Sequence, residues 1–150
     1  MRLGARPRRP RAQPARQEHP GQARAQGAQD VGGHPFTLLQ RIQRTALGDV
    51  NTSFADRHFA GALSKPDQAV TTGMREAQPW LKKLWRDKTK RGLSVRLDRE
   101  LARMTTLLEA AALPARFTTA QQSCFVLGYY HQKARYDEEM LAALEKKNKD

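Results

Sequence analysis

Apolar residues recur along most of the chain at the three- and four-residue spacing of an α-helix. The clearest case covers residues 93–113 and is followed by Pro114. Its apolar face consists of Leu93, Leu97, Leu101, Met104 and Leu108. A second stripe on the same segment is basic and consists of Arg96, Arg99 and Arg103. The two stripes point roughly 140° apart at about 100° per residue, so one face can pack while the other stays in water.

Earlier segments repeat this spacing. From about His34 an apolar stripe runs towards Gly48, where the first helix should end. That stripe consists of Leu38, Leu39, Ile42 and Ala46. A short helix should follow residues 51–53, each of which can cap it. Residues 67–88 predict a longer helix, which Pro79 should kink or split.

The last helix should run from about residue 119 into the 140s, because Thr118 and Gln121 have the spacing of a capping box. Between Cys124 and Tyr130 it is apolar nearly all round, which predicts a central, buried position. No alternating strand pattern or hairpin signal occurs in the sequence. We therefore predict an all-α domain over residues 34–150, a compact bundle of four to six helices.

Residues 1–33 differ from this domain in composition. Positions 1–30 contain seven arginines against two acids, together with four prolines, and their only large apolar residues are Met1 and Leu3. Such a segment cannot bury enough surface to offset its ordering entropy, so we expect a disordered basic tail. Its Arg-Pro run fits a nucleic-acid arm or a nuclear-import signal. Translation of GC-rich DNA from a wrong start or frame would give the same composition, and both interpretations stay open.

Overall charge narrows the class of protein. Lys and Arg total 27 against 15 Asp and Glu in 150 residues, a formal net charge of +12. This excess favours polyanionic partners, of which nucleic acid is the commonest in a cell. The single cysteine excludes an internal disulfide and a multi-cysteine zinc site. No apolar run approaches the ~18 residues of a membrane span, and no secretory signal follows the basic start. We therefore expect a cytoplasmic protein with no membrane partner.

Positive charge concentrates between residues 82 and 103, over a helix end, a loop and the outer face of the next helix. The basic residues are Lys82, Lys83, Arg86, Lys88, Lys90, Arg91, Arg96, Arg99 and Arg103. Three acids accompany these nine cations. Such a surface can follow a phosphate backbone and release counterions on binding, although a merely solvated helix face is the alternative. Trp85 shares the apolar stripe of Leu81 and Leu84, so we expect it in the core rather than stacked on an unpaired base.

Residues with catalytic potential are scattered. His34, His58 and His131 lack the spacing of a metal site, and His131 should be a hydrogen-bonded core histidine. Cys124 stands among apolar residues, which is typical of a small buried hydrophobe. No phosphate-binding glycine loop occurs. We therefore predict a protein that is not an enzyme and has no catalytic residues, metal, cofactor or small-molecule substrate.

The end of the predicted domain resembles a known family. Residues 125–132, FVLGYYHQ, are similar to the closing motif of the large subunit of type I-C CRISPR–Cas effector complexes. Residues 113–122, LPARFTTAQQ, resemble the approach to that motif. Residues 38–43, 46–51 and 56–59 are similar to the family's opening helix, its Asn-containing turn and its Asp-Arg-aromatic-Phe step.

This resemblance covers about residues 36–135 and leaves residues 1–33 without a counterpart. It implies the C-terminal helical bundle of a subunit several times longer. Type I-C systems also translate that region separately, from an internal start, as the small subunit of the complex. Such a subunit has no nuclease activity, since cleavage belongs to a recruited helicase-nuclease.

The resemblance also implies a function and partners. The chain would be a non-catalytic subunit of a crRNA-guided surveillance complex (Cascade) in antiviral defence, packed along the backbone filament beside the backbone and large subunits. It would bind the crRNA–DNA R-loop, mainly the displaced single-stranded non-target DNA. The nine basic residues are our physical inference for that contact, because the family motif does not supply them. Gly128 we expect to allow close helix packing.

Two other hypotheses stay open. The bundle could be a protein-interaction module that docks through its apolar and acidic surfaces, its basic face pairing with acids of the partner. It could also be a relic C-terminal fragment of the large subunit that binds nucleic acid without specificity. A sequence-reading regulator is disfavoured, because no exposed helix face is rich in Arg, Asn and Gln.

Overall fold

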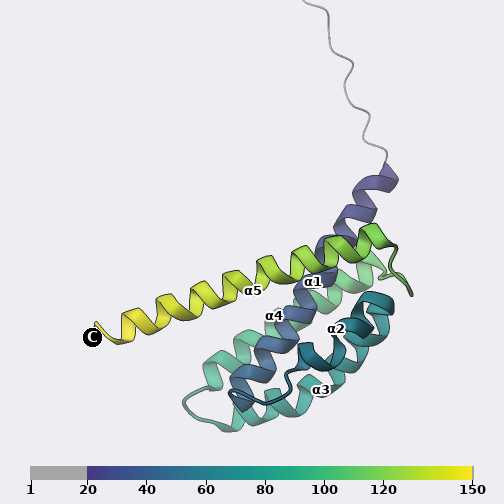
Figure 1. The fold of residues 1–150 in the computed structure, drawn as a ribbon. Helices are drawn as coiled ribbons and strands as arrows, with labels where there is room; N and C mark the ends of the chain where they lie inside the picture. The colour runs from purple at the N-terminus through teal and green to yellow at the C-terminus, as the bar shows by residue number, and fades with distance from the viewer. Residues whose placement is uncertain (1–19, 150) are drawn as a thin grey trace, which may run out of the picture.

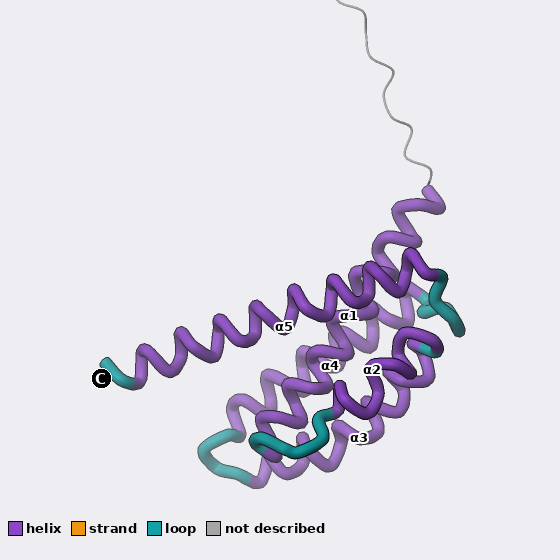
Figure 2. Tube along the Cα trace, in the orientation of Figure 1, coloured by secondary structure: helices purple, strands orange, loops and turns teal. Residues whose placement is uncertain are grey.

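The computed structural model describes the backbone of residues 20–149 and the side chains of residues 33–149. Five helices fill this range, and no strand occurs in it (Figures 1 and 2). They are α1 (Pro20–Leu47), α2 (Phe54–Ser64), α3 (Pro66–Arg86), α4 (Arg91–Ala111) and α5 (Thr119–Lys147). The predicted all-α class and the predicted range of helix number are confirmed.

Helix α1 lies at the centre of the bundle and contacts each of the other four helices. Its predicted apolar stripe is buried from Leu38 to Ala46. The ring of Phe36, also fully buried, lies 4.9 Å from that of Phe54 in α2 and 5.7 Å from that of Phe125 in α5. Burial of these rings away from water is the main stabilising contribution to the core.

Helix ends follow the capping chemistry of the sequence. Ser53 accepts a hydrogen bond from the backbone of Asp56, whose carboxylate in turn accepts one from the backbone of Ser53. Thr118 and Gln121 form the same reciprocal pair at the start of α5, as predicted. Helix α1 ends before Gly48, which has a φ of +74° that suits glycine. Each side-chain cap contributes about 1 kcal/mol.

Helix α5 lies on the outside of the bundle, so the prediction of a central position was wrong. Phe125 and Tyr129 are buried, but Leu127 is 59% exposed and Tyr130 57% exposed. Because α1 takes the centre, only one side of α5 has helices to pack against. The second half of α5 projects beyond the other helices (Figure 1).

The closest approach of α1 and α5 depends on Gly33. A Cβ atom at Gly33 would lie 2.6 Å from the backbone nitrogen of Tyr129 and 2.9 Å from the carbonyl carbon of Gly128. A Cβ at Gly128 would lie 4.0 Å from its nearest neighbour, the Cα of Gly33, which is ordinary contact. The role expected of Gly128 therefore belongs to Gly33.

The helix bounds bear on two further expectations. Helix α3 passes through Pro79 as one continuous helix, so of the two predicted outcomes the split into two helices did not occur. This proline is exposed, so water can reach the carbonyl that lost its partner. Helix α1 begins at Pro20, so residues 20–33 are helical although they were expected in the tail. They include three alanines and three glutamines, which are good helix formers, although four glycines accompany them, and proline is tolerated at a first helical position. The disorder predicted for residues 1–19 lies outside the described residues.

Candidate nucleic-acid interface

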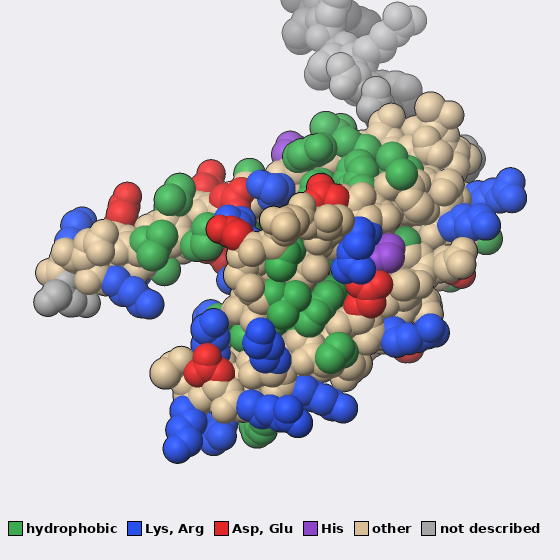
Figure 3. All heavy atoms as spheres, turned by 60° about the horizontal axis from the view of Figure 1, so that its bottom comes forward, with side chains coloured by type: hydrophobic (Ala, Val, Ile, Leu, Met, Phe, Trp, Pro, Cys, Tyr) green, Lys and Arg blue, Asp and Glu red, His purple; other side chains and the backbone are tan. Residues whose placement is uncertain are grey.

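The nine basic residues predicted as a site follow the hairpin of α3 and α4, and we call them the α3–α4 basic surface. The last two turns of α3 carry Lys82, Lys83 and Arg86, and the connecting loop carries Lys88 and Lys90. The other four lie on α4: Arg91, Arg96, Arg99 and Arg103. All nine side chains are exposed. Lys and Arg side chains gather along the lower edge of the molecule in Figure 3, where this hairpin lies. The predicted distribution of these residues over a helix end, a loop and the outer face of the next helix is confirmed. Their contact with nucleic acid stays a prediction.

The acids near this surface are partly engaged elsewhere. Asp87 accepts hydrogen bonds from the backbone nitrogen and the hydroxyl of Thr89, at 2.9 Å and 2.6 Å, which shape the α3–α4 loop. These bonds lower the pKa of Asp87 below its ordinary value. Glu100 accepts a hydrogen bond of 2.7 Å from the hydroxyl of Tyr136 in α5. Asp98 remains exposed beside the basic residues.

Within residues 33–149 the nine cations make no ion pair. Two of them make long hydrogen bonds to backbone oxygens, Lys90 to Thr45 and Arg91 to Trp85, both at 3.4 Å. Like charges collected on one hairpin repel one another unless counterions or a polyanion neutralise them. The positive charge of this surface is therefore available to an external anion.

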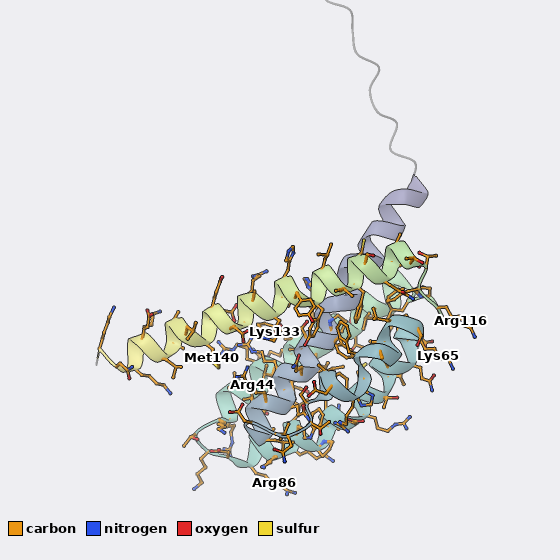
Figure 4. All side chains as sticks on the ribbon, in the orientation of Figure 1. Arg44, Lys65, Arg86, Arg116, Lys133 and Met140 are labelled. Carbon is orange, nitrogen blue, oxygen red and sulfur yellow. The ribbon has the colours of Figure 1, made fainter. Side chains whose placement is uncertain are left out.

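Basic residues of a second region are paired instead. Helices α1, α4 and α5 enclose a groove of about 800 Å³, the α1–α5 groove. Arg41 lies 3.3 Å from Glu139, and Asp137 lies 2.9 Å from Lys133 and 3.6 Å from Arg44. Figure 4 shows Arg44 and Lys133 in the angle between α5 and the bundle, away from Arg86 at the end of α3. Sequence reasoning missed this region, although the spacing of Lys133 and Asp137 could have indicated a helical ion pair.

The structure divides the basic surface between two hollows. Lys90 and Arg96 reach the α1–α5 groove. A cavity of about 470 Å³ opens between α3 and α4, and three of the nine cations line it: Lys82, Arg86 and Arg99. The remaining four line neither hollow: Lys83, Lys88, Arg91 and Arg103. The nine residues therefore do not line one groove but form a ridge with a hollow on each side.

Trp85 lines the α3–α4 cavity and is 51% exposed, so the prediction that it packs in the core was wrong. Leu81 and Leu84 are buried as expected. The buried hydroxyl of Ser94 donates to the carbonyl of Leu81 at 3.2 Å, which holds α4 against this side of α3. Trp85 is about 100° further round the helix than Leu84, and that rotation carries its indole out of the interface.

In the α1–α5 groove, Tyr136 has a strongly perturbed acidity. Burial, followed by the hydrogen bond to Glu100, raises the pKa of Tyr136 to about 12. The guanidinium of Arg41 lies 4.1 Å from the centre of the same ring, a cation–π contact. This tyrosine therefore joins α5 to α1 and α4 in its neutral form.

The histidines and the cysteine differ in part from expectation. His131 is exposed, because it lies on the outer side of α5, so its predicted place in the core was wrong. Cys124 is only half-buried. His58 lies 3.0 Å from Glu76, across the contact of α2 with α3. Among the described residues, no three His, Cys, Asp or Glu side chains are placed to hold a metal ion, and no helix is long and apolar enough to cross a membrane.

Comparison with known families decides the relationship of the chain. The family model described as CRISPR-associated protein (Cas_Csd1) matches residues 27–136, well over half of the 150 residues. The chain belongs to this family. It is thus a CRISPR-associated protein, as the resemblance implied. No curated protein matches the chain.

The limits of the match bear on the two regions. The Cas_Csd1 match begins at residue 27, inside α1, so the family covers residues 27–33, which were expected to match nothing. It includes the whole α3–α4 basic surface and ends at Tyr136. The acids of the α1–α5 groove at Asp137 and Glu139 therefore lie just beyond the matched range.

Proposed function

We propose that this chain is a non-catalytic subunit of a crRNA-guided type I-C surveillance complex. In that role it packs along the backbone filament beside the backbone and large subunits. It holds the displaced non-target DNA strand through contacts that do not depend on sequence. The observation that carries the proposal is the set of nine exposed cations, none in an ion pair within residues 33–149, on a chain of the Cas_Csd1 family.

The physical argument rests on the division of labour in guided complexes. Base pairing with the guide reads the target sequence, so the protein has only to hold backbones. Each phosphate neutralised by Lys or Arg releases counterions, and this release favours binding without regard to sequence. A ridge of free cations suits such a task. Cleavage is assigned to a separate recruited nuclease.

The test is charge reversal in the assembled complex. The full chain is co-expressed with type I-C backbone subunits and a guide RNA, and the purified complex is titrated with target DNA. Joint replacement of Arg96, Arg99 and Arg103 by Glu should weaken retention of the displaced strand about a hundredfold at ~0.1 M salt, since one phosphate contact of a single strand is worth roughly fivefold there.

A matched control separates a site from net charge. Replacement of Lys146, Lys147 and Lys149 by Glu makes the same change in net charge at the exposed end of the chain. This control should retain DNA nearly as well as the unchanged protein. Equal retention by both triple variants would refute the assignment of the basic surface.

A second function, a protein-docking module, is favoured by exposed apolar residues on the projecting half of α5. Met140, Leu141 and Leu144 are 44%, 58% and 51% exposed. Isolated apolar side chains on a surface are ordinary, but three within two turns favour contact with another protein.

A salt titration distinguishes the two functions. Nucleic-acid binding through six or more phosphates should weaken by orders of magnitude between ~50 and ~200 mM salt. Docking through apolar burial should weaken far less over that range. A complex that assembles normally but holds DNA no better than one lacking this chain would leave docking as the function.

A further inference from the structure

The exposed indole of Trp85 is the one large aromatic side chain of α3 that the core does not use. Trp80, on the same helix, packs against the core, with its ring 6.4 Å from that of Phe54. Trp85 instead stands half out of the fold, at the cavity between α3 and α4. Leaving a large apolar ring in water forgoes the burial that normally stabilises a tryptophan, so this position needs another explanation.

The cavity has the size and charge of a nucleotide site. Its volume of about 470 Å³ falls within the ~300–1,000 Å³ typical of small-molecule sites. Lys82, Arg86 and Arg99 line it with three positive charges against the one carboxylate of Asp98. Gln78 adds an amide that can both donate and accept hydrogen bonds. Two helices thus bring apolar, aromatic and cationic side chains together around one cavity.

The indole is held in place before any ligand binds. The guanidinium of Arg91 lies 5.4 Å from the centre of the Trp85 ring, within the range of a cation–π contact. The same side chain donates a hydrogen bond of 3.4 Å to the carbonyl oxygen of Trp85. A ring ordered in advance costs less entropy when a second ring stacks on it.

We propose that this cavity takes one unpaired base of a single strand, stacked on Trp85, while Lys82, Arg86 and Arg99 hold the neighbouring phosphates. This inference rests on the proposed function and deepens it, because it names the residue that distinguishes single-stranded from duplex nucleic acid. Every base has a π-face, so stacking on tryptophan tolerates any sequence. In a duplex the bases are already stacked and paired, so a duplex can offer this surface only its phosphates.

Tryptophan fluorescence tests the proposal directly. Replacement of Trp80 by Phe leaves Trp85 as the one tryptophan, since the chain has two. The full chain carrying this change is titrated with oligothymidylate and with an abasic oligonucleotide of equal length. We expect the fluorescence of Trp85 to be quenched by oligothymidylate and not by the abasic strand, which has phosphates without bases.

Affinity measurements with unlabelled variants complete the test. Trp85→Ala should weaken binding of oligothymidylate about tenfold and leave binding of the abasic strand unchanged. Trp85→Phe, which keeps an aromatic ring, should retain most of the affinity. The matched control is Tyr130→Ala, which removes an equally exposed aromatic from α5, outside the cavity, and should change neither affinity.

The outcomes separate this inference from the proposed function. Equal, salt-sensitive binding of both oligonucleotides that is indifferent to Trp85 would overturn the stacking site and leave the basic surface standing. If joint replacement of Arg96, Arg99 and Arg103 by Glu weakened binding of neither oligonucleotide, the proposed function itself would be overturned. A DNA duplex of equal length serves as a third probe. If it quenched the fluorescence of Trp85 as strongly as the single strand does, stacking would also be overturned.

Discussion

Two regions of this molecule carry basic side chains and differ in what surrounds the charge. In the α1–α5 groove, Arg41, Arg44 and Lys133 face the carboxylates of α5 at distances between 2.9 and 3.6 Å. On the α3–α4 basic surface, nine cations stand exposed without an ion pair in the described part of the chain. The pairs made by Arg41 and Arg44 hold α1 against α5, whereas unpaired cations remain free for phosphate. The difference is testable region by region.

The largest effect should come from the glycine that brings the two helices of the groove together. Gly33→Ala would place a Cβ within 3 Å of the α5 backbone, which cannot move aside as a side chain can. We expect a loss of about 2 kcal/mol in the free energy of unfolding, after allowance for the better helix propensity of alanine. Urea denaturation measures it.

Gly128→Ala is the matched control for this prediction. Its Cβ would meet only ordinary contact, so the same propensity gain should leave stability unchanged or raise it by up to ~1 kcal/mol. Identical unfolding midpoints for the two variants would show that the helices adjust to a methyl group at either position.

The next effect compares one free cation with one paired cation. Arg99→Gln should weaken binding of single-stranded DNA roughly fivefold at ~0.1 M salt and lower the salt slope of log K by about 0.7. Arg44→Gln removes the same charge from a side chain that already faces Asp49 and Asp137, so its effect should be under about twofold. Equal losses of affinity would erase the distinction between the two regions.

A third prediction uses alkaline pH to probe the groove alone. Because the folded protein raises the pKa of Tyr136 from 10.0 to about 12, it binds that proton more tightly than the unfolded chain does. The resulting stability is fully present below pH 10 and is lost as the pH rises towards 12. Burial raises the pKa of Tyr129 as well, with the same sign.

Tyr136→Phe removes this dependence at one position. Urea midpoints compared at about pH 9 and about pH 11.5 should fall less in the variant than in the unchanged protein. Nucleic-acid affinity at neutral pH should be the same in both, since the tyrosine is neutral there. If the urea midpoint fell equally in the two proteins, folding would leave the pKa of Tyr136 unchanged, which would contradict this prediction.

The smallest effect concerns the acid shared by Arg44 and Lys133. Asp137→Asn removes both ion pairs, which are partly exposed, so the expected loss of stability is about 0.5 kcal/mol. The freed cations should also raise DNA affinity slightly. Glu138→Gln, which changes an exposed neighbouring carboxylate without an ion pair in the described residues, should alter stability less. Thermal unfolding of the two variants side by side is the measurement.

Much of the fold could be predicted because it depends on neighbours in the sequence. Capping boxes at Ser53 and Thr118 need only residues three positions apart. The buried stripe around Leu39 and the exposed arginines of α4 follow from helical periodicity alone. Each of these features is settled within one or two helical turns.

Two of the failures share one cause, since each depended on which helix packs where. Trp85 and His131 lie on helices that were predicted correctly, yet both are more exposed than expected. Periodicity gives the angle of a side chain around its own helix but does not say where a neighbouring helix stops covering it. The predicted tail extended too far for a different reason, because the alanines and glutamines of residues 20–33 suit a helix as well as a tail.

The sequence by itself determined the helical class, the capped starts of α2 and α5 and the grouping of nine cations along one hairpin, because spacing and local hydrogen bonds decide these. Only the tertiary structure decided that α1 takes the centre, that Gly33 rather than Gly128 admits α5, and that Arg41 and Arg44 find carboxylates of α5 while Arg99 does not. Those outcomes depend on distances between segments far apart in the chain. Packing fixes such distances, and with them it decides which charges are neutralised and which remain free to bind.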